Sequence, residues 1–201
     1  DQFPILEEFP VRDARLRRLM ESLGQDSGAC HAMVTVVDTE GGLEELRGRA
    51  APQQIVLTIG LHARHAPEIA EAFGCPIRAP REVRDRRGDD FPFEPFTDGD
   101  EVAPGVTAIA VTALAADEVV LHLDVAEGAL AFGDALMHYG DTISFVPDDL
   151  MGEHPERVKA RLTDALRGLL TRDFDHLLFA HGDPLVGGGK AALRDFVGRQ
   201  A

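Results

Sequence analysis

Three strand-like apolar runs in this 201-residue chain end in the same way, and this shared ending limits the possible fold more than any other feature. Each run leads into a side chain that can bind a metal, through or beside a glycine. The runs are 57–60, followed by His62 and His65; 130–133, followed by Asp134; and 178–180, followed by His181 and Gly182. Layered α/β folds bind ligands at the carboxyl ends of strands, because loops there carry polar groups on a rigid frame. We therefore expect these side chains to converge in one cleft.

Hydrophobic periodicity and turn residues predict a mixed α/β arrangement. Strand–turn–helix units at both ends of the chain flank a middle region of short strand-like runs, which we expect to form an antiparallel meander. The expected strands are 32–37, 54–59, 75–78, 106–112, 118–124, 129–132 and 176–180. The expected helices are 11–23, 43–48, 67–74, 155–170 and 189–197, and the charged stretch 81–90 reads as a solvated excursion. This order indicates one layered domain with mixed sheets, to which helix 11–23 is a candidate addition.

Length, charge and cysteine content exclude several classes of protein. A chain of 201 residues with 44% hydrophobic residues is long enough for one buried core, so a single domain over 1–201 is expected. The net charge of −15 opposes binding to nucleic acid or to an anionic membrane face, because both would repel this surface. No apolar run approaches the roughly 18 residues that span a bilayer, and residues 1–8 lack a signal-peptide pattern. Cys30 and Cys75 lie in apolar stretches typical of buried free thiols, so we expect a cytoplasmic protein.

The metal-capable segments resemble the motifs of a known family. Segment 56–65 is similar to the Thr-His-x-His-x-Asp-His loop of the metallo-β-lactamase superfamily. Segment 131–134 resembles the strand of that family that carries its bridging aspartate, and 179–184 resembles its C-terminal Gly-His-Gly-x-Pro loop. The order and spacing fit from about residue 34 to the end. The resemblance implies an αββα sandwich of two mixed β-sheets flanked by helices, with a one- or two-metal hydrolytic site between the sheets.

The sequence also departs from the motif of that family. If His65 stands on the last histidine of the motif, Gly60 stands on the first histidine and Arg64 on the aspartate. The third histidine of the family, expected after 106–112, is missing, because 113–116 is Ala-Leu-Ala-Ala. A guanidinium offers no lone pair, so Arg64 cannot replace a carboxylate ligand, and its charge opposes a nearby dication. A two-metal catalyst is therefore not expected.

Two interpretations of the surviving residues stay open. In the first, one Zn, Fe or Mn ion is held by four side chains: His62, His65, Asp134 and His181. In the second, no metal binds, and Arg64 fills the empty position and pairs with Asp134. The first gives a mononuclear metal-dependent hydrolase of weak activity, and the second gives a non-catalytic ligand-binding or interaction module. In both, the partner is a small molecule, with an anionic one favoured by the second; the sequence does not determine the substrate or the oligomeric state.

Other polar residues have simpler interpretations. Segment 187–190 lacks the spacing of a phosphate-binding loop, so Lys190 is at most an anion contact at the start of a helix. Asp148, Asp149 and His154 precede the helix expected at 155–170 and are expected to cap it. Structural roles are also expected for the histidines without a partner at ligand spacing: His122, His138 and His176.

Overall fold

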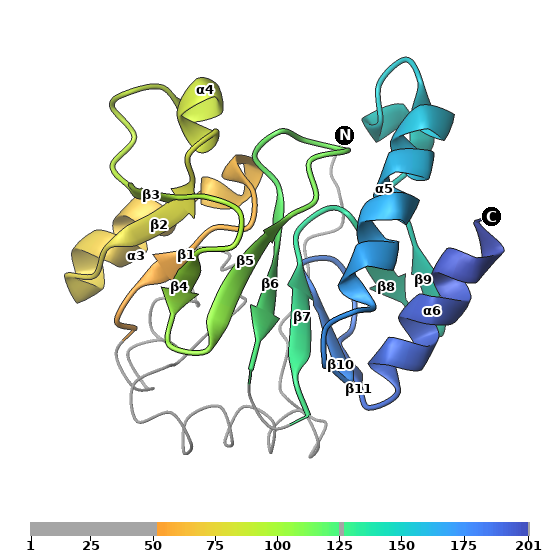
Figure 1. Ribbon diagram of the computed structural model, residues 1–201. Coiled ribbons are helices and arrows are strands. Elements are labelled where there is room, and N and C mark those ends of the chain that lie inside the picture. Colours follow the sequence, from red (N-terminus) through yellow and green to blue (C-terminus); the bar gives the residue numbers. More distant parts are fainter. Residues whose placement is uncertain (1–51, 125–126, 201) are drawn as a thin grey trace.

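The computed structural model describes residues 52–124 and 127–200 (Figure 1). The strands are β1 (Ile55–Val56), β2 (Ile77–Pro80), β3 (Glu94–Phe96), β4 (Glu101–Ala103), β5 (Val106–Ala110), β6 (Val119–Leu123), β7 (Ala129–Phe132), β8 (Met137–Tyr139), β9 (Thr142–Ser144), β10 (His176–Phe179) and β11 (Leu185–Val186). The α-helices are α3 (Ala66–Phe73), α4 (Val83–Arg87), α5 (Pro155–Leu169) and α6 (Gly189–Arg199), and the 3-10 helices are η1 (Gly60–Ala63) and η2 (Asp148–Leu150).

Two layers of strands form the centre of the described part, and the larger of the two is a mixed sheet. The larger sheet has the order β11-β10-β7-β6-β5-β4, and the smaller sheet has the order β1-β2-β3. Strands β4 to β7 form an antiparallel meander, as predicted for the middle of the chain, and β10 adds to β7 in parallel. Strands β8 and β9 form a separate hairpin. The smaller sheet is parallel throughout.

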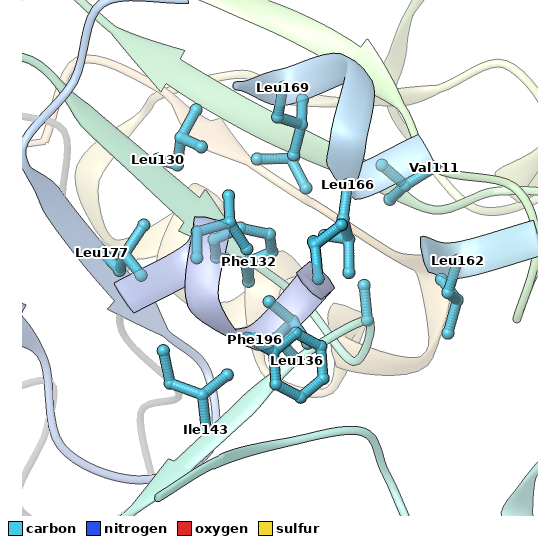
Figure 2. Packing of buried hydrophobic residues seen from close by; sticks show 14 of the residues in the cluster. Val111, Leu130, Phe132, Leu136, Ile143, Leu162, Leu166, Leu169, Leu177 and Phe196 are labelled. Atoms are coloured by element: carbon cyan, nitrogen blue, oxygen red, sulfur yellow. The ribbon is translucent and has the colours of Figure 1, made fainter. Parts of the chain in front are cut away.

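The side chains of β7 show what packs on each face of the larger sheet. Successive side chains of a strand point to opposite faces. Leu130 and Phe132 belong to one buried cluster, which also contains Leu166 of α5 and Phe196 of α6. Figure 2 shows these side chains packed together in the cluster. Helices α5 and α6 therefore cover this face of the larger sheet, as Figure 1 also shows.

The opposite face of the larger sheet packs against the smaller sheet. Small side chains of β7, Ala129 and Ala131, share a buried cluster with Phe96 of β3, and Val56 of β1 packs against it. The outer side of the smaller sheet is covered by α3 and α4, whose Ala66 and Val83 pack with residues of β1 and β2 in a third cluster. The layers are therefore helix, sheet, sheet and helix, which is the αββα order expected from the sequence.

Helix ends follow local sequence signals. Helix α3 has Pro67 in its first turn and ends at Gly74, whose φ of 65° is a left-handed conformation that glycine adopts without strain. Helix α5 starts at Pro155, with Glu156 in its first turn. Cys75 is a buried free thiol, as predicted, and burial raises its pKa. No helix in 52–124 or 127–200 is long and apolar enough to cross a membrane.

Two predictions about local structure are wrong. The stretch 81–90 is not only a solvated excursion: it contains α4, which is anchored by the fully buried Val83. The expected caps of α5 are also absent, since its N-cap residue His154 makes no side-chain capping bond. Asp148 instead pairs with Lys159 at 2.8 Å, because α5 presents a cation at that distance. The expected elements 11–23, 32–37 and 43–48 and the thiol of Cys30 lie outside the described residues.

The packing of α5 on the larger sheet predicts the cost of removing one core side chain. Leu166 is fully buried, so Leu166→Ala should lower the free energy of unfolding by about 2–5 kcal/mol through lost contacts and a residual cavity. Leu150 is 52% exposed, so the matched change Leu150→Ala should cost less than about 0.5 kcal/mol. Urea unfolding of the full chain measures both. Equal losses for the two variants would mean that α5 does not cover the sheet as described.

Candidate metal centre

Three side chains from distant parts of the chain meet at the carboxyl ends of the sheets. His62 lies in η1 shortly after β1, Asp134 follows β7, and His181 follows β10. The Nε2 atoms of His62 and His181 lie 3.1 Å and 3.0 Å from the same oxygen, Oδ1 of Asp134. The two imidazole rings are 5.4 Å apart and meet edge to face. One candidate ligand atom from each residue lies within 4.8 Å of the others.

Burial and charge make Asp134 the negative centre of this group. Its side chain is 14% exposed, that of His62 is 12% exposed, and that of His181 is 30% exposed. Burial alone would raise the pKa of Asp134, but hydrogen bonds from His181 and His62 and their positive charges outweigh it, and they hold the pKa far below its usual range. Asp134 is therefore an ionised carboxylate at neutral pH, and His181 is the member most open to solvent.

The structure brings together three of the four predicted ligands. His65 stands at the N-cap of α3, where its backbone carbonyl accepts the Ile69 N–H at 3.0 Å. Its ring nitrogens are not part of the group of ligand atoms formed by the other three residues. The structure therefore supports a candidate site with three side-chain ligands, His62, Asp134 and His181.

The ion pair predicted between Arg64 and Asp134 is wrong. Arg64 is exposed, and within the described residues Asp134 pairs with His62 and His181 and not with Arg64. Both imidazoles contact Oδ1 of Asp134, while the side chain of Arg64 is exposed at the surface. The geometry thus removes the interpretation in which Arg64 fills a metal position.

Lys190 lies at the opposite end of β10 from the candidate metal centre. Its ammonium donates to the backbone carbonyl of Arg172 at 2.5 Å, lies 3.6 Å from the carboxylate of Asp173 and sits over the ring of Phe174. These residues precede β10, whereas His181 follows it. Lys190 therefore ties α6 to the start of β10 and does not reach the group around Asp134.

Glu118 holds the turn that carries Asp134. One of its oxygens, Oε1, accepts the backbone N–H groups of Asp134 at 2.7 Å and Ala135 at 2.5 Å. The side chain is fully buried, and its other oxygen has no hydrogen-bond partner among the described residues. Gly133 leaves room for this arrangement, since a Cβ there would lie 3.1 Å from Thr58 Oγ1 and 3.3 Å from Glu118 Oε1. Glu118 thus fixes the backbone of the metal-capable aspartate.

Asp117 holds the turn that carries His62. Its Oδ2 accepts the backbone N–H of Gly60, the first residue of η1, at 2.9 Å. The guanidinium of Arg86 donates to both oxygens of the same carboxylate, at 2.9 Å and 3.0 Å. A Cβ at position 60 would lie only 2.7 Å from Asp117 Oδ2, so this position cannot hold a histidine without displacing the carboxylate.

A backbone contact fixes the turn that carries His181. The N–H of His138 in β8 donates to the carbonyl of His181 at 3.1 Å, and the N–H of Asp183 donates to the carbonyl of His138 at 2.8 Å. Between them, Gly182 has a φ of 97°, and a Cβ there would lie 1.8 Å from the His138 carbonyl oxygen. Only glycine fits at this close approach.

The histidines predicted to be structural are bonded to other groups. The rings of His122 and His138 lie 2.8 Å and 2.7 Å from the backbone carbonyls of Asp173 and Asp183. The ring of His176 accepts the Gly187 N–H at 3.0 Å. Among the described residues, none of these three histidines belongs to a group of ligand atoms that could hold an ion, so the candidate centre stays with His62, Asp134 and His181.

The chemistry and spacing of the three donors fit one transition-metal ion. Two imidazoles and one carboxylate are typical ligands of Zn, Fe and Mn. An ion about 2.0–2.2 Å from each donor requires donor–donor distances of about 3–4 Å, and the observed separations of 3.0 and 3.1 Å are compatible with this. Three protein ligands leave a coordination position open, which is typical of catalytic rather than structural sites.

This chain is similar to known proteins in its three-dimensional structure but not detectably in its sequence. No protein-family model and no curated protein sequence matches this chain. A B3 metallo-β-lactamase with an active-site glutamic acid matches with a TM-score of 0.54 at 16% identity, over 79% of this chain and 71% of that chain. A metallo-β-lactamase superfamily protein from the archaeon Sulfolobus tokodaii matches at 0.52 and 12% identity, over 76% and 69%. TTHA1623 in a di-iron-bound form matches at 0.53 and 18% identity, over 77% and 81%.

The crowding at position 60 predicts that even Gly60→Ala, which adds one methyl group, destabilises the fold. Gly60→Ala should lower the free energy of unfolding by about 1–3 kcal/mol, because the added methyl group meets a carboxylate held on both oxygens. Gly168→Ala is the control, since a Cβ there meets nothing within 4 Å and alanine favours a helix by about 0.5–1 kcal/mol. Chemical unfolding compares the two. A Gly60→Ala variant as stable as the Gly168→Ala variant would show that position 60 is open.

The burial of Glu118 predicts a stability that falls with rising pH. Burial and the charge of Asp134 raise its pKa to about 8 in the folded chain, against two backbone hydrogen bonds that lower it, from an ordinary value of 4.5. The folded chain thus keeps a proton that the unfolded chain releases. The corresponding stability is complete below pH 4.5 and is lost as the pH rises to about 8.

Glu118→Gln tests this dependence, because glutamine is neutral at every pH and can still accept both N–H groups. Between these two pH values the wild-type free energy of unfolding should fall by up to about 1.4 kcal/mol per pH unit relative to the variant. Urea unfolding at a series of pH values provides the comparison. Parallel curves for the two proteins would mean that Glu118 is not held protonated.

Proposed function

The chain has the metallo-β-lactamase fold, and we propose that it is a mononuclear metal-dependent hydrolase that binds one divalent ion through His62, Asp134 and His181. One observation carries the proposal: two imidazole nitrogens approach a single carboxylate oxygen, at 3.1 Å and 3.0 Å. Each of the three residues follows a different strand, so the framework of the sheets fixes the arrangement.

The ligand set supports one ion rather than two. Position 60 holds a glycine without room for a side chain, and position 64 holds an exposed arginine. The loop after β5 provides Asp117 and Glu118, which hold backbone groups, and no histidine. The di-iron form of TTHA1623 is a property of that protein; here we propose a single Zn, Fe or Mn ion.

A bound ion would supply Lewis acidity, which polarises a carbonyl or phosphoryl oxygen and makes water a nucleophile at neutral pH. Asp134 provides the negative charge that binds a dication and, held by Glu118, keeps one orientation. His62 is nearly enclosed, whereas His181 is 30% exposed. We therefore place a small-molecule substrate on the His181 side of the centre.

A non-catalytic ligand-binding module on the same scaffold is the second candidate. One observation favours it: His62 and His181 both lie within hydrogen-bonding distance of Asp134, so the three side chains satisfy one another without an ion. A small anionic ligand would then find cations at the exposed Arg64 and at the 35% exposed Arg86. A metal-free protein that binds such a ligand without hydrolysing it would fit this candidate.

Metal content separates the two candidates. After exposure to Zn²⁺ and dialysis, the full chain should retain one equivalent of zinc, and Asp134→Asn or His181→Ala should lower the affinity at least tenfold, because each removes a ligand or its charge. His154→Ala, at an exposed histidine, should leave binding unchanged. Elemental analysis and calorimetry measure these quantities.

Three outcomes would count against the proposed hydrolase. Two retained equivalents would show that a second ligand set exists, and no retained metal would favour the binding module. The third outcome is a zinc-loaded wild type that cleaves esters, thioesters, lactams and phosphodiesters no faster than the His181→Ala variant does. The protein would then bind metal without acting as a hydrolase. A metal-dependent rate that chelation removes is the expected result.

A further inference from the structure

The pair formed by Arg86 and Asp117 is directed at the turn that carries His62. Asp117 is 3% exposed, and within the described part of the chain its carboxylate accepts three hydrogen bonds from two partners, the guanidinium of Arg86 and the N–H of Gly60. Gly60 opens η1, the short helix that contains His62 two residues later. The His62 N–H donates to the carbonyl of Ile59 at 3.1 Å. The turn is therefore held both by its own backbone hydrogen bond and by the carboxylate of Asp117.

The same pair fills the space in front of position 60. A Cβ at Gly60 would lie 2.7 Å from Asp117 Oδ2, 3.1 Å from Arg86 Cδ and 3.3 Å from Val83 Cγ1. The carboxylate cannot move away freely, because Arg86 holds both of its oxygens. A side chain at position 60 and the Arg86–Asp117 pair therefore exclude each other.

We propose that Arg86 and Asp117 form a positioning clamp that fixes His62 for metal binding and, by occupying the space before position 60, limits the centre to one ion. This inference rests on the proposed function for the metal and on the described geometry for the clamp. Neither residue is placed as a ligand: both act through the backbone of η1.

The neighbouring residue supports a role in positioning. Glu118 directly follows Asp117 and holds the backbone of Asp134, so two consecutive carboxyl groups hold the turns of two proposed ligands. Buried ion pairs contribute little to stability compared with well-packed apolar side chains, because desolvation offsets their attraction. Their fixed hydrogen-bond geometry is the property that an apolar pair would lack.

Helix α4 supplies the cation. Of its arginines, Arg84 lies over the ring of Phe93 and Arg87 over that of Phe91, whereas Arg86 reaches Asp117. Helix α4 also packs against η1. The charged segment around α4 is thereby connected to the metal centre through one side chain.

Four full-length variants test the clamp: Arg86→Gln, Asp117→Asn, the double variant, and Arg87→Gln as the control for loss of an arginine from the same helix. Zn²⁺ titration calorimetry reports affinity, urea unfolding reports stability, and NMR reports amide exchange of Gly60 and the ring-nitrogen shifts of His62 without metal. Removing groups that orient ligands lowers metal affinity about 10–100-fold in other proteins.

A positioning clamp predicts that each single variant binds Zn²⁺ at least about tenfold more weakly than Arg87→Gln. The double variant should regain stability, because no unpaired buried charge remains, yet should not regain affinity. Affinity that recovers together with stability would show a structural role only and would overturn the proposal. The same holds if the single variants match Arg87→Gln in affinity.

NMR on the metal-free protein tests the clamp separately from the proposed hydrolase function. If the wild type binds no Zn²⁺, the proposed hydrolase fails, and the clamp is decided by NMR alone. Faster Gly60 exchange and shifted His62 ring nitrogens in the folded single variants and the double variant, but not in Arg87→Gln, support it. Unchanged exchange and shifts in the double variant, which keeps no charge in the pair, refute it.

Discussion

Two adjacent buried carboxyl groups, Asp117 and Glu118, hold the backbone around the candidate metal centre. Asp117 accepts a hydrogen bond from the turn that carries His62, and Glu118 accepts two from the turn that carries Asp134. They lie directly before β6, the strand beside β7 in the larger sheet. His62 follows a strand of the smaller sheet, and Asp134 follows a strand of the larger sheet. The Asp117–Glu118 dipeptide therefore connects the two sheets where the candidate ligands meet. The cost of burying these groups is met in different ways, by an ion pair for Asp117 and by retention of a proton for Glu118.

This arrangement is compatible with a conserved fold in which the metal motif of the superfamily that the sequence resembles is reduced. The strand ends still present imidazole and carboxylate to one point, because their positions depend on sheet register and on glycines such as Gly182. At position 60, in contrast, the space for a side chain is taken by the Arg86–Asp117 pair. The scaffold thus brings together three candidate ligands, a number that would suit one ion with an open position.

Much of the fold could be predicted from the sequence because its signals are local. Pro155 and Gly74 mark helix ends, and the apolar run 129–132 marks a central strand; the structure agrees at each. The convergence of His62, Asp134 and His181 followed from the shared pattern of strand ends. The roles of Asp117, Glu118 and Arg86 did not, because each depends on contacts between residues 16 to 57 positions apart. A pair of acidic residues directly before the apolar run 119–123 was the available signal, and it reads as an ordinary turn without the partner groups.

The most direct test of a single three-ligand centre is anomalous diffraction from crystals of the full chain soaked in Zn²⁺ or Mn²⁺. A single three-ligand centre predicts one peak, at about 2.0–2.2 Å from His62 Nε2, Asp134 Oδ1 and His181 Nε2, with Arg86 still bound to Asp117. A second peak beside His65, or a peak that displaces the Asp117 carboxylate from Gly60, would contradict it.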